Sequence, residues 1–248
     1  MAVQQRYRTR PFAPDRAAGP LAQLVLLAVL YRVVGLGPVG WLTGAVFAVG
    51  TWAALTRALR GSWLPSFGPA NRVTLARATL VGGVTALVAD SFARRAPVTV
   101  LVGLAAVALL LDAVDGRVAR RTGTATALGA RFDMEVDAFL ILVLCVYVAV
   151  PLGPWVLAIG ALRYLFVAAS WALPWLRAPL PPSTARKTVA AVQGVVLVAA
   201  GTGVAPRGLA LGAVAGALAL LVWSFGRDVG WLWRTRERAA GGGAGTAA

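Results

Sequence analysis

Histidine is absent from this 248-residue chain. The chain therefore lacks the side chain that proteins use most often as a general base near neutral pH and as a transition-metal ligand. It has a single cysteine, Cys145, which excludes a disulfide framework within the chain. Any metal site must be built from oxygen ligands, which favour hard cations such as Mg²⁺ or Mn²⁺.

Charged residues are also scarce. They make up 13% of the chain, against about a quarter in a typical soluble domain, whereas hydrophobic residues make up 59%. A water-soluble fold cannot bury that much apolar surface, so we predict an all-α integral membrane protein. The net charge is +15, but the arginines cluster at the ends of apolar segments, which is typical of membrane topology signals. We therefore expect membrane lipids, and no nucleic acid, among the partners.

Apolar segments long enough to cross a bilayer recur along the chain. A transmembrane helix needs about 20 mostly apolar residues, and clusters of proline, glycine and arginine separate eight such segments. The fold class predicted is a polytopic bundle of about eight transmembrane helices. They cover approximately residues 20–36, 40–58, 71–92, 97–116, 126–150, 154–175, 188–204 and 207–226.

Basic residues favour one side of this bundle, with Arg94 and Arg95 as exceptions. Because the basic side faces the cytoplasm, we expect a plasma-membrane protein with both termini inside the cell. Four parts are predicted: a basic N-terminal tail, a two-helix extension without acidic residues, a six-helix core, and a basic, glycine-rich C-terminal tail with a disordered end. They cover residues 1–19, 20–60, 70–227 and 228–248.

Five of the nine acidic residues lie between positions 112 and 137. A carboxylate in hydrocarbon costs about 2.5–3.5 kcal/mol on insertion scales, so it indicates a functional site. Asp112 and Asp115 are three residues apart, and Asp133 and Asp137 are four apart, so each pair shares a helix face. The short turn between the two segments makes them antiparallel neighbours. We therefore predict that the four aspartates converge near the cytoplasmic surface and bind one or two Mg²⁺ or Mn²⁺ ions.

Small residues and arginines accompany these aspartates. Gly116, Ala119 and Gly129 would let a flat ligand approach the backbone, and Arg120 can form two hydrogen bonds to a phosphate.

An alternative interpretation is that the aspartates only join helices through ion pairs with Arg77, Arg117 and Arg120. That arrangement leaves part of the negative charge unbalanced in a low dielectric, which is costly. Glu135 lies on another helix face, and we expect it to be a packing or dimer contact.

The cluster follows a pattern that resembles the signature of the CDP-alcohol phosphotransferase family. The match covers 26 residues and specifies eight: Asp112-x2-Asp115-Gly116-x2-Ala119-Arg120-x8-Gly129-x3-Asp133-x3-Asp137. The segment Asn71-x2-Thr74-x2-Arg77 is similar to the opening of the family's first core helix. The segment 183–188 resembles the opening of its fifth, with Arg186-Lys187 in place of the frequent Gly-Lys. Residues 70–227 look like the six-helix core.

The resemblance implies an enzyme of phospholipid biosynthesis, and a homodimer. The enzyme would move a phosphatidyl group from a CDP-linked donor, usually CDP-diacylglycerol, to an alcohol and release CMP. A metal pair would bind Asp112, Asp115 and Asp133, and Asp137 would complete the metal site and take the acceptor's proton. The implied CDP-binding residues are Asn71, Thr74, Gly116, Ala119, Arg120 and Gly129.

The acceptor stays open. Arg163 lies in the middle of a predicted span, where an arginine is costly unless it faces a polar cavity. With Arg186 and Lys187 it would form a basic pocket for a phosphorylated polyol, such as glycerol 3-phosphate or inositol phosphate. In the other interpretation, Arg163 pairs with an acidic residue, and the other two only mark the cytoplasmic side. Asp90 is expected to pair with Arg94 or Arg95.

Two other classes of protein use carboxylates between membrane helices. A divalent-cation transporter or channel would place them near mid-membrane on interrupted helices, whereas here they lie at one membrane face beside arginine and small residues. A membrane prenyltransferase resembles a layout with two distant aspartate motifs, whereas here the aspartates share one helix hairpin. The phosphotransferase is therefore the preferred function, with the transporter as the alternative.

Overall fold

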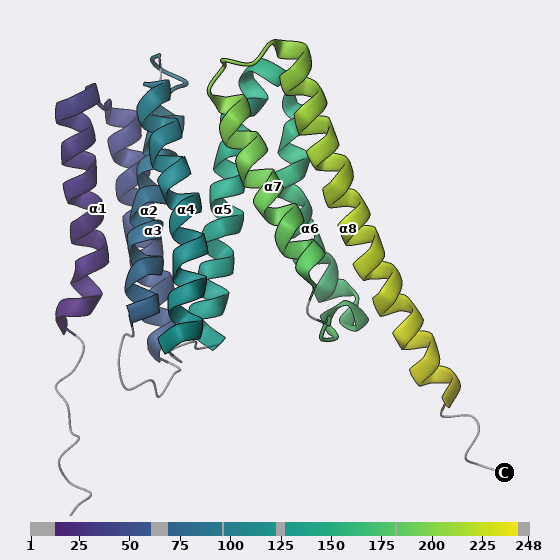
Figure 1. The fold of residues 1–248 in the computed structure, drawn as a ribbon. Helices are drawn as coiled ribbons and strands as arrows, with labels where there is room; N and C mark the ends of the chain where they lie inside the picture. Colours follow the sequence, from purple (N-terminus) through teal and green to yellow (C-terminus); the bar gives the residue numbers. More distant parts are fainter. Residues whose placement is uncertain (1–12, 61–68, 96, 123–126, 182, 243–248) are drawn as a thin grey trace, which may run out of the picture. The chain divides into compact units, whose positions relative to one another are not determined.

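The computed structural model describes residues 13–60, 69–95, 97–122, 127–181 and 183–242. Within these ranges every regular element is a helix (Figure 1). Two short 3₁₀ helices, η1 (Pro154–Val156) and η2 (Pro174–Arg177), flank α6. The α-helices are α1 (Ala13–Val34), α2 (Pro38–Arg60), α3 (Pro69–Asp90), α4 (Val98–Thr122), α5 (Ala127–Leu152), α6 (Leu157–Ala172), α7 (Thr184–Gly201) and α8 (Arg207–Gly242).

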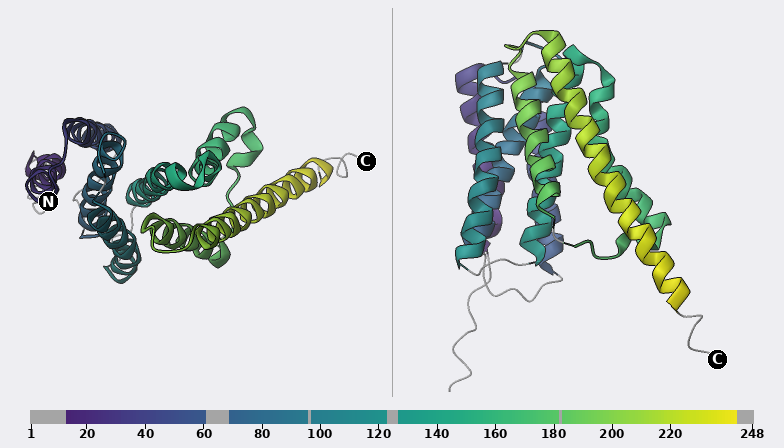
Figure 2. Two further views of the ribbon diagram at one scale, coloured as in Figure 1. Left: turned by 90° about the horizontal axis from the view of Figure 1, so that it is seen from above. Right: turned by 45° about the vertical axis from the view of Figure 1, so that its right-hand side comes forward.

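The eight α-helices correspond one to one with the eight predicted segments. The largest difference is at α8, which continues without a break to Gly242 instead of ending near residue 226 (Figure 2). The predicted segment ended where the charged residues Arg227 and Asp228 follow the apolar run, whereas the helix continues through the helix-favouring Leu, Arg, Glu and Ala residues beyond them. The disorder predicted for the chain end concerns mainly residues 243–248, which lie outside the described ranges.

Four stretches are long and apolar enough to cross a membrane: Val73–Asp90, Gly129–Leu152, Pro154–Ala172 and Arg207–Arg236. Three other helices carry shorter apolar stretches: Gly19–Val34, Pro38–Ala54 and Val98–Asp112. The prediction of an all-helical protein with membrane-spanning segments is therefore supported. The number of helices that cross the bilayer stays a prediction.

The chain forms two compact units, and the first contains the N-terminal helices. Unit 1 comprises Met1–Pro97 and Gly103–Val136, and unit 2 comprises Val98–Val102 and Asp137–Ala248. In unit 1, α1, α2 and α3 pack side by side (Figures 1 and 2). The two-helix extension thus packs directly onto α3, the first helix of the predicted core. The predicted domain boundaries themselves stay a prediction.

Asp90 ties the end of α3 to the turn between α1 and α2. Its carboxylate accepts a hydrogen bond from the Gly37 backbone N–H (3.1 Å) and lies 3.7 Å from Nε of Arg94. Arg94 also donates a hydrogen bond to the backbone carbonyl of Gly35 (2.8 Å). Gly35 has a positive φ of 68°. The expected pairing of Asp90 with Arg94 is confirmed, and it has a structural role.

In unit 2, α7 and α8 pack along each other (Figure 1). The buried Gln193 of α7 donates a hydrogen bond to the carbonyl of Ala217 in α8 (2.8 Å), among the buried side chains of Leu197 and Val214. The hydrogen bond offsets part of the cost of burying this amide between two apolar helices, whereas the amide oxygen of Gln193 has no hydrogen-bond partner among the described residues.

Candidate active site

Arg77 of α3 contacts acidic residues of both α4 and α5. Its side chain is 1% exposed, and its guanidinium lies 3.1 Å from the carboxylate of Asp112 in α4 and donates a hydrogen bond to Asp133 in α5. The side chains of Asp112 and Asp133 are 44% and 31% exposed. One buried cation thus lies between two carboxylates that retain access to solvent or ligand.

Asp137 extends this pair into a cluster of three carboxylates. Asp133 and Asp137 are four residues apart on α5, so their side chains follow one face of the same helix. One oxygen each of Asp112, Asp133 and Asp137 lie within 4.8 Å of one another, and all three residues are half-buried. The predicted convergence of these three aspartates is therefore observed. Side-chain details of Asp115 lie outside the described residues, although its backbone belongs to α4.

The donor set fits a hard divalent cation. Mg²⁺ and Ca²⁺ bind oxygen ligands at about 2.0–2.6 Å, so carboxylate oxygens within 4.8 Å of one another can ligate one ion. The three aspartates carry three negative charges, and Arg77 supplies one positive charge. The excess of negative charge favours a cation.

The predicted nucleotide-binding residues are described only in part. Thr74 is buried one helical turn before Arg77 and on the same face of α3. Gly129 is half-buried in the first turn of α5. The side chains of Asn71, Ala119 and Arg120, and the surroundings of Gly116, lie outside the described residues. Their common cytidine slot stays a prediction.

Arg77 was not among the predicted site residues. It appeared in the sequence as the third member of the Asn71-x2-Thr74-x2-Arg77 motif and as one partner in the alternative, purely structural interpretation. The structure shows the Arg77 ion pairs of that interpretation, and these coexist with a carboxylate cluster able to hold a metal. The side chains of Arg117 and Arg120 lie outside the described residues. Glu135 is exposed on α5, and its packing or dimer role stays a prediction.

A second charge cluster lies in unit 2, where α7 begins. The Asp228 carboxylate of α8 lies 3.2 Å from Arg186 and 3.4 Å from Arg227. Arg227 also donates to Oγ of Ser183 (3.1 Å), the N-cap residue of α7, and Arg186 donates to the carbonyl of Pro181. Asp228 and Arg227 were not among the predicted site residues, because the basic residues after the last apolar segment were attributed to membrane topology.

The other two predicted acceptor residues lie on neighbouring elements of the chain. Arg163 is half-buried in α6, and Lys187 is exposed in the first turn of α7. The position of Arg186 is defined by its ion pair with Asp228. A common acceptor pocket for the three stays a prediction.

Comparison with known families gives a direct assignment. The model of the CDP-alcohol phosphatidyltransferase family matches residues 68–225, which is more than half of the chain. The chain therefore belongs to this family of phosphotransferases, whose members use a divalent metal and transfer a phosphorylated group from a CDP-alcohol to an alcohol acceptor. The match begins at α3 and leaves out α1 and α2. No curated protein and no solved structure matches the chain.

Proposed function

We propose that this protein transfers a phosphatidyl group from a CDP-diacylglycerol-like donor to a small alcohol, and releases CMP, at the cytoplasmic face of the plasma membrane. The observation that carries the proposal is the cluster of Asp112, Asp133 and Asp137, whose oxygens lie within 4.8 Å of one another. These residues occupy three of the four aspartate positions of the family's signature.

Asp112, Asp115, Asp133 and Asp137 would hold Mg²⁺ or Mn²⁺, and the resemblance implies two ions. The bound metal would neutralise charge on the donor's diphosphate, which lowers the barrier to displacement at phosphorus. Arg77 keeps Asp112 and Asp133 together. Thr74 and Gly129, with Asn71, Gly116, Ala119 and Arg120, would line the nucleotide site.

The reaction is a displacement at the phosphorus that carries the diacylglycerol. The acceptor oxygen forms a bond to this phosphorus, the bond to the oxygen of CMP breaks, and CMP leaves with the bonding electrons. In this proposal Asp137 takes the proton of the acceptor hydroxyl. A carboxylate is a weak base in water, but beside a divalent cation it accepts a proton that has already become more acidic.

The membrane setting suits a lipid donor. The aspartates lie at one end of long apolar helices, since Asp133 and Asp137 begin the apolar stretch Gly129–Leu152 of α5. The acyl chains of the donor would remain in the bilayer while its headgroup reaches these residues. The arginine pair around Asp228 suits an acceptor that itself carries a phosphate, such as a phosphorylated polyol.

Family membership favours a transferase over a divalent-cation transporter. The contact of Arg77 with two of the carboxylates supports this preference, because a fixed arginine repels a cation that must pass through a site. Of the four proposed ligands, only Asp115 has no described side chain.

The test is a transfer assay with purified protein in detergent. Labelled CDP-diacylglycerol and a panel of alcohols and phosphorylated polyols are supplied with Mg²⁺ or Mn²⁺, and both CMP and the lipid product are identified by mass. We expect equal amounts of CMP and lipid product with one class of acceptor, and none after the metal is chelated. Cation uptake into vesicles without CMP release would overturn the proposal in favour of the transporter.

A further inference from the structure

Helix α3 has two faces with different partners. Arg77 contacts Asp112 and Asp133. Ala78, Gly82 and Ala86, each four residues apart, form a stripe of small residues along another face. This stripe meets the two N-terminal helices, because Ala78 lies beside residues of α1 and α2 and a Cβ on Gly40 of α2 would lie 3.0 Å from the carbonyl oxygen of Ala86.

The contact is closest at Gly82. A Cβ added there would lie 2.4 Å from Oε1 of Gln23 in α1 and 2.6 Å from the ring of Phe47 in α2. At Gly83 a Cβ would lie 2.7 Å from the side chain of Leu26 in α1. Side chains of both N-terminal helices therefore lie against the glycine backbone of α3, closer than a Cβ on α3 would allow unless those side chains shift.

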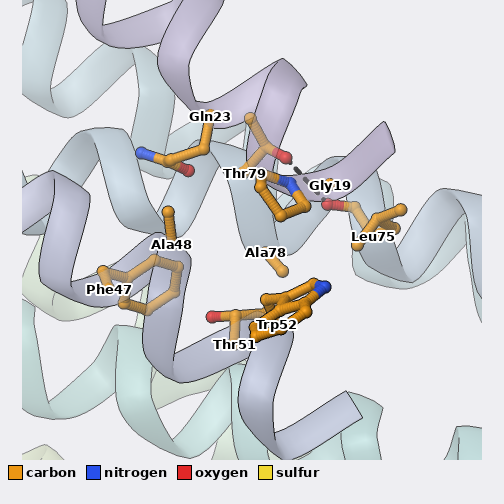
Figure 3. Close-up of a pocket in the computed structure, with 10 residues that line it drawn as sticks. Gly19, Gln23, Phe47, Ala48, Thr51, Trp52, Leu75, Ala78 and Thr79 are labelled. Carbon is orange, nitrogen blue, oxygen red and sulfur yellow. Dashed lines mark hydrogen bonds between the residues drawn. The ribbon is translucent and has the colours of Figure 1, made fainter. Parts of the chain in front are cut away.

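Gln23 is held at this contact by packing. It is 2% exposed, and its amide oxygen and nitrogen have no hydrogen-bond partner among the described residues. Beside it lies a cavity of about 20 Å³, lined by Thr51, Trp52 and Thr79 among others (Figure 3). Because this cavity lies beside Gln23, shortening Gln23 enlarges the empty space near Gly82. A side chain introduced at Gly82 can then avoid part of its clash.

We propose that the two N-terminal helices position α3, and through Arg77 set the spacing of Asp112 and Asp133 that metal binding requires. Gln23 and Gly82 are positioning residues in this proposal. The physical basis is that all these residues belong to unit 1 and that close-packed interiors transmit displacements. The proposal rests on the proposed function for its catalytic consequence, and it assigns a role to helices that lie outside the family match.

The test introduces leucine at Gly82 and, as a matched control, at Gly50 of α2, where an added Cβ meets nothing within 4 Å. Because a displacement of about 1 Å can reduce catalysis about 100-fold, we expect Gly82→Leu to weaken Mn²⁺ binding about tenfold or more and to lower kcat. Mn²⁺ binding is measured by electron paramagnetic resonance on the full chain. Gly50→Leu should behave like the wild type in both measurements.

Rescue separates positioning from general damage. Gly82→Ala should weaken Mn²⁺ binding only a few-fold, and adding Gln23→Ala should restore part of the loss, because it removes the Gln23 contact with the added Cβ while the Phe47 ring remains beside it. This pair also carries the test if Gly82→Leu does not fold. The proposal is overturned if Gly82→Leu folds and binds Mn²⁺ normally, or if Gln23→Ala restores none of the binding lost in the Gly82→Ala chain.

A measurement that needs neither metal nor substrate can test the positioning role even if the proposed enzymatic function is wrong. Hydrogen exchange is compared between wild type and Gly82→Leu, or Gly82→Ala if the leucine variant does not fold. Faster exchange at the acidic ends of α4 and α5 supports the positioning role, even if the wild type releases no CMP. Faster exchange confined to α1 and α2 would contradict it, whatever the enzyme assay shows.

Discussion

The two arginine–aspartate clusters of this protein have opposite compositions. Around Arg77 there are three aspartates, Asp112, Asp133 and Asp137, so negative charge is in excess. Around Asp228 there are two arginines, Arg186 and Arg227, so positive charge is in excess. In each cluster the minority charge contacts two members of the majority.

This difference indicates what each cluster can bind. A single opposite charge holds the like charges of a cluster together but does not neutralise all of them. Each cluster therefore has a net charge that can attract a ligand of the opposite charge. The Arg77 cluster favours a divalent cation, and the Asp228 cluster favours a phosphate.

The largest effect is expected at Asp133. Asp133→Asn should reduce CMP release at least about 1000-fold, since metal stabilisation of the transition state is worth several kcal/mol and each 1.4 kcal/mol is a factor of ten. The melting temperature should also fall, because Asp133 is an ion-pair partner of the buried Arg77, so CMP release is compared on folded protein well below the melting transition. Arg131→Gln is the matched control at an exposed position of the same helix, with activity expected within about twofold by the usual tolerance of surface positions. Comparable loss in both variants would remove the metal role from Asp133.

Arg77→Gln tests whether the positive charge of Arg77 holds the carboxylates of Asp112 and Asp133 together. Loss of a buried ion-pair partner costs about 3–5 kcal/mol, and the partial exposure of Asp112 and Asp133 reduces this to about 1–3 kcal/mol. We expect a lower melting temperature in a metal chelator and a lower kcat. Arg77→Lys, which keeps the charge but loses the planar guanidinium, should lie between wild type and Arg77→Gln. Unchanged stability in both variants would contradict the contact.

The Asp228 cluster is tested by the acceptor kinetics. Arg186→Gln should raise the acceptor KM about tenfold or more, because a hydrogen bond to a charged group is worth about 1.5–3 kcal/mol, while the donor KM stays unchanged. Asp228→Asn should lower the acceptor KM, since it releases Arg186 and Arg227 from their carboxylate. A rise in both KM values would show that the cluster is structural.

The smallest effect is expected at Arg163. If it contributes to the acceptor pocket, Arg163→Ala raises the acceptor KM by a few-fold, as loss of a weak, partly solvated charge contact of about 0.5–1 kcal/mol predicts. The donor KM should not change. Acceptor kinetics equal to wild type would leave Arg163 with a structural role in α6 and restrict the acceptor site to the residues around Asp228.

The helices were predictable because the signal for each is local. A run of apolar residues bounded by proline, glycine or arginine is sufficient to place a helix, and the eight predicted segments correspond to the eight α-helices. The end of α8 was not predictable in this way, because helix propensity continues after the apolar run stops. The meeting of Asp133 and Asp137 was predictable as well, because four residues on one helix determine a shared face.

The contacts of Arg77 and Asp228 required the structure. Arg77 contacts residues 35 and 56 positions away in the sequence, on two other helices. Asp228 contacts Arg186 across 42 positions. No periodicity links positions so far apart, and a single charge near the end of an apolar segment is indistinguishable from a topology signal. The contact between Gln23 and Gly82 was unpredictable for the same reason, because these residues are far apart in the sequence and lie on different helices.

The length of α8 has a practical consequence for anyone who shortens this chain. At about 1.5 Å per residue, its 36 residues extend about 54 Å, well beyond a hydrocarbon layer of about 30 Å. The part after residue 226 carries Asp228 and also Trp233, whose ring packs edge-to-face against Trp175 of η2 at 5.4 Å. A truncation just after residue 226, where the predicted apolar segment ends, would not be expected from the sequence to remove any contact. It would leave Arg186 without its carboxylate and η2 without its aromatic neighbour.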